Sequence, residues 1–161
     1  MELFNTYIQS PVGLLEICGT VTAITAVNFR EEKGVESSIV PEVLKDCAKQ
    51  LTEYFKGSRK EFTVPLQAEG TAFQKRVWME LQNIGFGETI SYLDLALTLR
   101  DEKLTRAVGS ANGKNPIAII IPCHRVIGES GKLTGYAGGM WRKKWLLELE
   151  GNVSGKSLTL F

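Results

Sequence analysis

The residues of this chain best suited to chemistry stand side by side in the stretch IIIPCHRV. Cys123, His124 and Arg125 follow an apolar run and a proline, and His124 is the only histidine among the 161 residues. Thiolate is the nucleophilic form of cysteine, and the pKa of a thiol falls when a histidine, a cation or a helix N-terminus lies near it. A cysteine that follows a buried strand at a proline is also held on stiff backbone. The stretch is therefore a candidate for nucleophilic catalysis.

These residues alone leave a second interpretation open. Side chains that follow one another on an extended chain point to opposite sides, so adjacency in the sequence does not establish contact. Cys123 would then pack in the core, and His124 would only satisfy a buried carbonyl group.

The elements that come first in the chain indicate a small α/β unit. The first thirty residues alternate apolar and polar side chains, with turn residues between the segments, which is typical of antiparallel strands. From Pro41 the apolar spacing becomes that of a helix, which is expected to end at Gly57. Cys47 lies on the apolar face of this helix and Cys18 within a strand, so both are predicted to be buried structural thiols. Residues 62–70 show no periodicity and are predicted to form a linker.

The next elements are predicted to be short helices. Thr71 with Gln74, and Ser91 with Asp94, form capping-box patterns at the starts of two of them. A third helix, LTRAVGSANG, follows the second after the loop RDEK. Two short helices joined by a tight turn and followed by basic residues favour a helix-turn-helix, although an αα-hairpin packed in a small bundle gives the same pattern.

Two more elements flank Cys123. The run IAIIIP before it is predicted to be a short buried strand. The glycine-rich loop GESGKLTGYAGG after it leads to a last helix, MWRKKWLLELEG, which is expected to end at Gly151.

Composition and length are those of an ordinary globular protein. The chain is 43% hydrophobic and long enough for one domain or for two small domains in contact. No apolar stretch approaches the roughly 20 residues that span a bilayer, and the first residues lack a secretory signal, so we expect a cytoplasmic location, or a nuclear one in a eukaryote, and no membrane partner. Three widely spaced cysteines without a C-x-x-C pair predict reduced thiols and no metal site.

The net charge of +1 hides an uneven distribution. Residues 1–69 hold 7 Lys and Arg against 10 Asp and Glu, whereas residues 100–145 hold 9 against 3. The basic excess therefore surrounds Cys123, where it would suit a polyanionic partner, although a solvated basic face is the alternative.

The segment from Asn115, NPIAIIIPCHRVIGESGKLTGYAGG, and the helix that ends LLELEG closely resemble the O6-alkylguanine-DNA alkyltransferases, also called methylated-DNA–protein-cysteine methyltransferases. GTAFQKRVWMELQNIGFGETISYLDLA and TRAVGSAN match the same family in the same order, so the resemblance covers about residues 70–151. It implies an α+β fold. A small N-terminal α/β domain with antiparallel strands would occupy residues 1–69. A mainly helical domain with a helix-turn-helix and the active-site loop would occupy residues 70–161.

The resemblance implies a DNA repair protein that acts once. The protein would flip O6-alkylguanine out of duplex DNA and transfer the alkyl group irreversibly to Cys123 in a single stoichiometric reaction. It implies that His124 activates the thiol through a water, that Glu150 orients the imidazole, and that Asn115 ties the loop to this network. Tyr92 would offer its hydroxyl to the base. No cofactor is implied.

Other residues would hold the substrate, again by resemblance. Carbonyl groups of Cys123 and Val126 would accept from the guanine amine, and the amide of Ala137 would donate to the leaving base, while Tyr136 and Gly138 complete the wall. Arg106 would enter the base stack, Tyr92 would turn the target phosphate, and a helix of about residues 104–112 would lie in the minor groove. The small residues of that helix, Ala107, Gly109, Ser110 and Ala111, would allow close approach to the DNA. The expected partner is double-stranded DNA that contains O6-alkylguanine, bound by a monomer.

The sequence departs from the family pattern in two turns. Arg100 and Glu102 stand where the family places glycine and proline, and Phe86 stands where many relatives have proline. Two other classes of function remain as alternatives. A cysteine hydrolase would use Cys123, His124 and Glu150 over many turnovers, and a regulatory DNA-binding module would not need Cys123.

Overall fold

The computed structural model describes residues 1–156 and Leu160, and the chain divides into two compact units. The first unit is Met1–Glu69 together with Pro116–Ala118. The second is Gly70–Asn115 together with the described residues from Ile119 onward. The unit boundary at Glu69 lies at the end of the segment that the sequence predicts to be a linker. Pro116–Ala118 joins the first unit because it pairs with a strand there, which local sequence pattern does not indicate.

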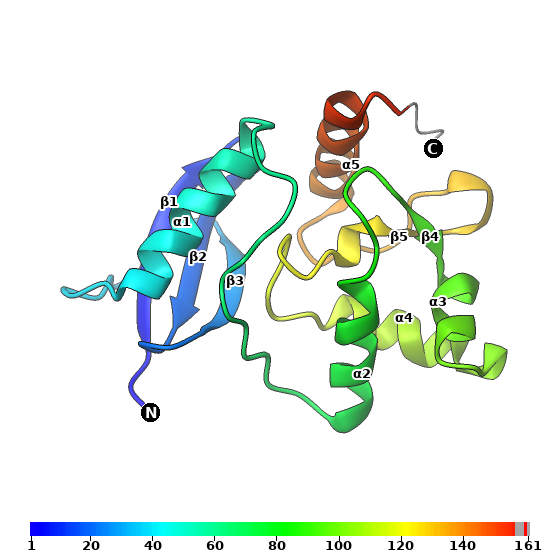
Figure 1. Cartoon of the computed structure of the whole chain (residues 1–161), viewed down its shortest axis with the longest axis horizontal. Coiled ribbons are helices and arrows are strands. Elements are labelled where there is room, and N and C mark those ends of the chain that lie inside the picture. The colour runs from blue at the N-terminus through cyan, green and yellow to red at the C-terminus, as the bar shows by residue number, and fades with distance from the viewer. Residues whose placement is uncertain (157–159, 161) are drawn as a thin grey trace. The chain divides into compact units, whose positions relative to one another are not determined.

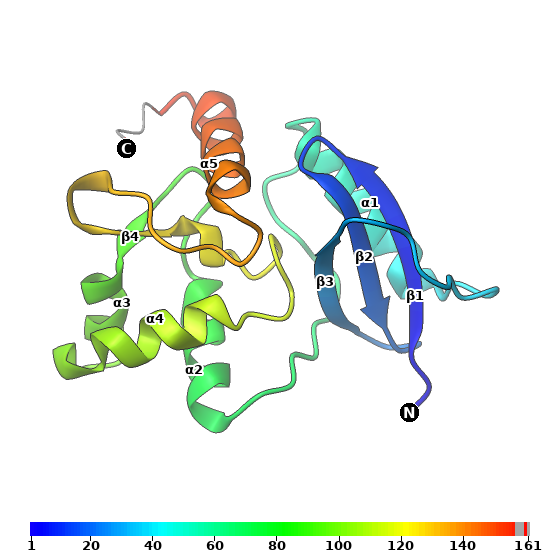
Figure 2. The same ribbon diagram turned by 180° about the vertical axis from the view of Figure 1, so that it is seen from behind.

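The first unit is a three-stranded antiparallel sheet with one helix on it. Strands β1 (Phe4–Ser10), β2 (Gly13–Gly19) and β3 (Ile24–Arg30) lie in the order β1-β2-β3. Helix α1 (Glu42–Phe55) covers one face of the sheet, as the two opposite views show (Figures 1 and 2). The fully buried side chains Leu15 and Ile17 of β2 lie on the covered face, since alternate strand residues share a face. Together with the helices of the second unit, this sheet confirms the predicted α+β class.

The three thiols differ in burial. Cys47, on the apolar face of α1, is fully buried as predicted. Cys18 was predicted to be buried as well, but the structure places it half-buried. Its position in β2 alternates with Ile17, so it shares a face with Glu16, away from α1.

The predicted strand IAIIIP does not form as a strand. Only Ile117 pairs with β3, where the Val27 amide donates to the Pro116 carbonyl at 3.0 Å and the Ala118 amide donates to the Val27 carbonyl at 3.3 Å. Ile119 then adopts a φ of 72°, an uncommon conformation for a β-branched residue, and the extended backbone ends there. The apolar run is buried for its whole length, which explains why its composition resembled that of a strand.

The second unit is mainly helical. Its elements are α2 (Ala72–Leu81), β4 (Ile90–Ser91), α3 (Tyr92–Thr98), the 3-10 turn η1 (Glu102–Leu104), α4 (Thr105–Gly113), η2 (Cys123–Arg125), β5 (Val126–Ile127), η3 (Glu129–Gly131) and α5 (Met140–Ser154). Both predicted capping boxes are confirmed, at the starts of α2 and α3. The buried indole of Trp78 on α2 donates to the Ala111 carbonyl of α4 at 2.8 Å, which fixes these two helices to each other.

The turn between α3 and α4 contains a non-glycine residue with a positive φ. Arg100 takes a φ of 64°, and the Asp101 side chain accepts a hydrogen bond from the Lys103 amide at 2.9 Å. The aspartate thus caps η1, which leads directly into α4.

The last helix is longer than predicted. Gly151 does not end it, because the chain stays helical to Ser154 and turns at Gly155, which has a φ of 74°. A left-handed residue after the last turn favours glycine, and Gly155 meets that requirement, whereas Gly151 is buried within the helix. None of the helices in the described part of the chain is long and apolar enough to cross a membrane.

Candidate functional site

Cys123 begins η2 directly after Pro122, and hydrogen bonds fix its backbone. Its amide donates to the Ile121 carbonyl at 2.8 Å, and the side chain of Asn115 donates to the same carbonyl at 2.7 Å. The residue keeps only 6% of its surface exposed. Burial raises the pKa of the Cys123 thiol, while a hydrogen bond with Asn115 and the charge of Lys143 lower it in part. The resting side chain is therefore a thiol that needs a base.

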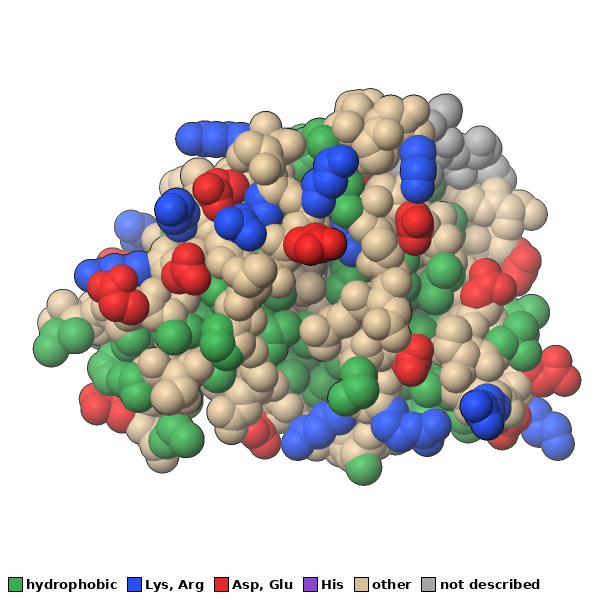
Figure 3. Space-filling model, viewed as in Figure 1, with side chains coloured by type: hydrophobic (Ala, Val, Ile, Leu, Met, Phe, Trp, Pro, Cys, Tyr) green, Lys and Arg blue, Asp and Glu red, His purple; other side chains and the backbone are tan. Residues whose placement is uncertain are grey.

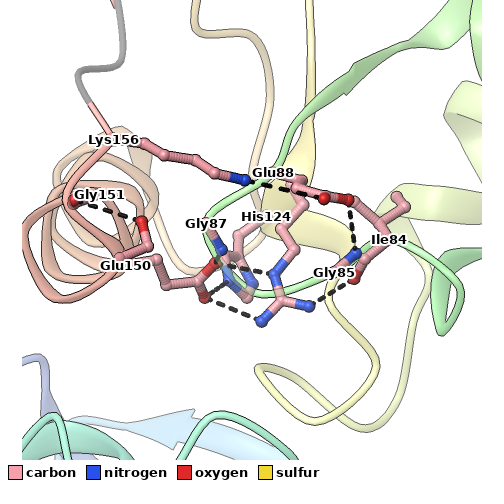
Figure 4. Close-up of polar contacts among 10 residues, drawn as sticks. Ile84, Gly85, Gly87, Glu88, His124, Glu150, Gly151 and Lys156 are labelled. Atoms are coloured by element: carbon pink, nitrogen blue, oxygen red, sulfur yellow. Dashed lines mark hydrogen bonds and ion pairs between the residues drawn. The ribbon is translucent and has the colours of Figure 1, made fainter.

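His124 pairs with Glu150 rather than with the neighbouring cysteine. Its Nε2 lies 2.7 Å from Oε2 of Glu150, and both side chains are fully buried (Figure 4). Burial lowers the pKa of His124, and the nearby carboxylate opposes this only in part. A neutral imidazole must donate Nε2–H to a carboxylate acceptor, so we assign the proton to Nε2. The buried Nδ1 has no hydrogen-bond partner among the described residues and keeps its lone pair for a proton.

Arg125, to which the sequence pattern assigns no role, completes this cluster. Its Nε lies 2.8 Å from Oε1 of Glu150 and its Nη2 lies 3.2 Å from Oε2, while Nη1 donates to the Ile84 carbonyl at 2.6 Å. Burial alone would raise the pKa of Glu150, but the interactions with His124 and Arg125 hold it well below its usual range. One signal was present in the sequence: an arginine inside a buried run needs a carboxylate partner.

Lys143 is a second buried charged residue to which the sequence pattern assigns no role. It is fully buried on α5, and its Nζ donates to the carbonyls of Val126 at 2.6 Å and Thr134 at 2.7 Å. Burial lowers the pKa of Lys143 to about 8. The available signal was helical spacing, since Lys143 stands seven residues before Glu150 on the same face of α5.

The predicted substrate-binding residues lie in the second unit. Tyr92 is the first residue of α3, and its hydroxyl accepts from Oγ1 of Thr134 at 3.0 Å. Tyr92 follows β4 directly, and β4 is held in place because its Ile90 pairs with the buried Val126 of β5. On the glycine-rich loop, Tyr136 is half-buried, Ala137 is exposed and Gly138 is buried.

The exposed face of α4 carries small side chains and one cation. Arg106, Ala107 and Ser110 are exposed and Gly109 is half-buried, whereas Ala111 is buried and does not belong to this surface. Lys and Arg side chains also lie along the edge of the unit below α2 and α4 (Figure 3).

Asn112 connects this helix to the nucleophile. It lies on the buried side of α4, and its Nδ2 donates to the carbonyl of Cys123 at 3.3 Å. Nothing in its local sequence pattern distinguished it. Over the described residues, no cluster of three or more His, Cys, Asp and Glu side chains could hold a metal ion.

Comparison with known proteins gives matches over both units. Residues 3–68 match the family model described as 6-O-methylguanine DNA methyltransferase, ribonuclease-like domain, and residues 72–152 match that described as 6-O-methylguanine DNA methyltransferase, DNA binding domain. A methylated-DNA–protein-cysteine methyltransferase of Methanosarcina acetivorans is 45% identical over 157 residues, which cover 93% of this chain and 99% of that protein. One of Mycolicibacterium paratuberculosis is 46% identical over 158 residues, 96% of each chain.

Solved structures match as well. The crystal structure of Mycobacterium tuberculosis O6-methylguanine methyltransferase has a TM-score of 0.85 and 44% identity, over 94% of each chain. The structure of Mycobacterium tuberculosis OGT in complex with DNA has a TM-score of 0.83 and 47% identity, over 91% of this chain and 92% of that one.

Proposed function

This chain belongs to the methylated-DNA–protein-cysteine methyltransferase family, and on that premise we propose that it repairs DNA by moving the alkyl group of O6-alkylguanine to Cys123. The observation that carries the proposal is the buried arrangement of a thiol, a neutral imidazole and an ionised carboxylate beside a helix with a small-residue surface. The similar structure of Mycobacterium tuberculosis OGT in complex with DNA supports a DNA partner for this chain.

The reaction needs the base outside the duplex. An alkyl carbon on guanine O6 lies at the major-groove edge of a stacked base, where the buried thiol of Cys123 cannot reach it, so the nucleotide must rotate into the protein, at a cost of about a few kcal/mol. We propose that the exposed face of α4 enters the minor groove and that Arg106 fills the space the base leaves. Contacts of this kind carry little sequence information, which suits a protein that must find one lesion in any sequence. Such binding weakens as the salt concentration rises.

The chemical step follows from the protonation states. The Cys123 thiol proton passes through a water to Nδ1 of His124, and Glu150 holds the imidazole in place. Sulfur then forms a bond to the alkyl carbon while the bond from that carbon to O6 breaks. The electron pair of the broken bond moves into the guanine, which takes up a proton. We assign this donation to the Tyr92 hydroxyl, which accepts from Thr134 of the active-site loop. The thiol proton held on His124 then passes back through solvent to restore the tyrosine hydroxyl, so that the net transfer is from the thiol to guanine.

Other groups would hold the flipped base. Guanine would donate through its amine to the carbonyls of Cys123 and Val126, and the Ala137 amide would donate to the base, with Tyr136 and Gly138 as walls. The Val126 carbonyl accepts from Lys143 and has a second lone pair for the substrate. The Cys123 carbonyl accepts from both Asn112 and the Val126 amide, so the guanine amine would have to take the place of one of these donors. Asn115 would keep the loop in place through Ile121.

The product is a thioether, which has no electrophilic carbonyl for water to attack. One chain therefore repairs one lesion. We propose that the protein works as a monomer, since every residue assigned a role lies in one unit. A nucleophilic thiol must stay reduced, which favours the cytoplasm, or the nucleus of a eukaryote.

The experiment is to mix the protein with a duplex that carries one O6-methylguanine and to measure the mass of the intact chain. We expect a gain of one methylene's mass at Cys123 that saturates at one per chain. Cys123→Ser should keep DNA binding and gain nothing, and Cys18→Ser, a half-buried thiol of the first unit, is the matched control that should react as the wild type. Repair beyond one equivalent would indicate a hydrolase, and unchanged protein and DNA would indicate a binding module.

A further inference from the structure

We propose that Arg125 is a positioning residue that holds His124 in the neutral form with its proton on Nε2, so that Nδ1 is available as the base. The inference rests on the proposed function and adds Arg125 to the three residues, Cys123, His124 and Glu150, that the reaction already requires.

The geometry around Glu150 carries the first step. Its carboxylate accepts from Nε and Nη2 of Arg125, from Nε2 of His124 and from the Gly87 amide at 3.2 Å. Two of these contacts form a guanidinium fork, which fixes the plane of the carboxylate. Because that plane is fixed, Oε2 is held in one position in which it accepts from Nε2 of His124. The imidazole ring therefore points Nε2 toward the carboxylate and Nδ1 away from it.

Charge balance carries the second step. A buried imidazole beside an unshared carboxylate gains a proton readily, since an ion pair then forms. Here Arg125 already supplies the positive charge that neutralises Glu150, with side chains 8% and 0% exposed. A proton on His124 would leave the pair with an extra, uncompensated charge in a site away from water, which is unfavourable. Glu150 raises the pKa of His124, and Arg125 and Lys143 lower it, on top of the larger lowering by burial.

The elements packed around His124 offer few other charges. From α5 it faces Glu150 and Lys143, and from its own turn Arg125 and the Cys123 thiol. The charged residues of α2 lie at the surface, where Lys75 and Arg76 are exposed and Glu80 is only half-buried. Arg125 is therefore the cation that shares a hydrogen-bonded carboxylate with the imidazole.

The turn after α2 holds Arg125 in this position. Its Nη1 donates to the Ile84 carbonyl, and its guanidinium lies 5.9 Å from the centre of the Phe86 ring. The Gly87 amide donates to Glu150, which also accepts from His124. Gly87 has a φ of 80°, and a Cβ added there would lie 2.6 Å from Oγ of Ser154. Figure 4 shows Ile84, Gly87, His124 and Glu150 gathered in one cluster.

The test uses the fact that the chain has one histidine, so imidazole nuclear magnetic resonance signals need no assignment. Long-range proton–nitrogen spectra of the ¹⁵N-labelled, DNA-free protein distinguish the two neutral tautomers from the imidazolium. In the wild type we expect the neutral Nε2–H form across the neutral pH range. In Arg125→Met we expect imidazolium at pH values where the wild type is neutral. Arg125→Lys, which keeps the charge and loses the fork, should resemble the wild type more closely, and Arg59→Met, whose partner is Glu53 in the first unit, should match it.

Single-turnover alkyl transfer provides the second readout. Near neutral pH, Arg125→Met should react about tenfold to a hundredfold more slowly than the wild type and should recover as pH rises, because general-base assistance is worth about 10²–10⁴ in rate. A residue that only supported the fold would lower the rate equally at every pH.

Three outcomes would overturn the inference. They are an imidazolium or an Nδ1–H tautomer in the wild type at neutral pH, an unchanged imidazole in Arg125→Met, and a rate loss that does not depend on pH. If Arg125→Met fails to fold, the wild-type spectrum and the Arg125→Lys spectrum test the inference, because both should show mainly the neutral Nε2–H imidazole near neutral pH. A wild type that gains no methyl group would refute the proposed function, whereas the spectra would still report the state of His124.

Discussion

Replacing Lys143 by methionine tests the role of the buried ammonium group most directly. Methionine keeps most of the buried stem and removes two hydrogen bonds, to the carbonyls of Val126 and Thr134, which join both ends of the active-site loop to α5. A hydrogen bond from a charged donor contributes about 1.5–3 kcal/mol, but burying the ammonium offsets part of that gain. We expect Lys143→Met to lower the free energy of unfolding by about 3 kcal/mol near neutral pH.

The loss should grow with pH. The pKa of Lys143 is lowered from 10.5 to about 8 in the folded chain, so above that value the unfolded chain holds more protons at this residue than the folded chain does. Stability rises with pH wherever the unfolded state binds more protons. Between about pH 7 and about pH 10, this residue should therefore add about 2 kcal/mol to the stability of the wild type and nothing to that of the variant.

Urea denaturation at both pH values, under reducing conditions, measures both effects. Lys144→Met is the matched control, because this exposed neighbour makes only a surface contact with Glu148 at 3.8 Å and should change stability little. Alkyl transfer by Lys143→Met should also slow, since the loop wall is no longer held. The reasoning fails if wild type and Lys143→Met lose or gain stability in parallel across this pH range.

Three further predictions concern stability and use urea denaturation. Burial lowers the pKa of His124 in the folded chain below its usual value, so the unfolded chain takes up the proton first as pH falls. The wild type should therefore lose stability toward about pH 5 more steeply than His124→Gln. Trp78→Phe should cost about 1–2 kcal/mol, since the Ala111 carbonyl then keeps only the Lys114 amide as a donor, and no change would contradict the contact with the indole. Gly87→Ala should cost about 1–3 kcal/mol, because of its φ and the close Oγ of Ser154, whereas Gly113→Ala, which meets nothing within 4 Å, should not lower stability.

The features that the sequence predicted correctly depend on short-range interactions. Capping boxes join residues three apart, and strand and helix periodicities repeat over a few residues, so the starts of α2 and α3 and the sheet of the first unit could be read from local pattern. The wrong predictions also had local grounds. The apolar run before Cys123 has the composition of a buried strand, but the positive φ of Ile119 ends its extended backbone. Gly151 has the residue type of a helix end, but α5 continues to Ser154 and turns at Gly155.

By itself, the sequence determined the family resemblance, the antiparallel sheet of the first unit and the starts of α2 and α3, and it predicted Cys123 as the nucleophile, because these follow from residue types and spacing within single segments. Only the tertiary structure decided which charges meet. Arg125 and Glu150 are 25 residues apart, and the Gly87 amide and Glu150 are 63 apart. Lys143 and Asn112 likewise gain their partners from other segments. Packing removes these groups from water, so each must find a partner, and which partner is in reach depends on how the segments fold against one another.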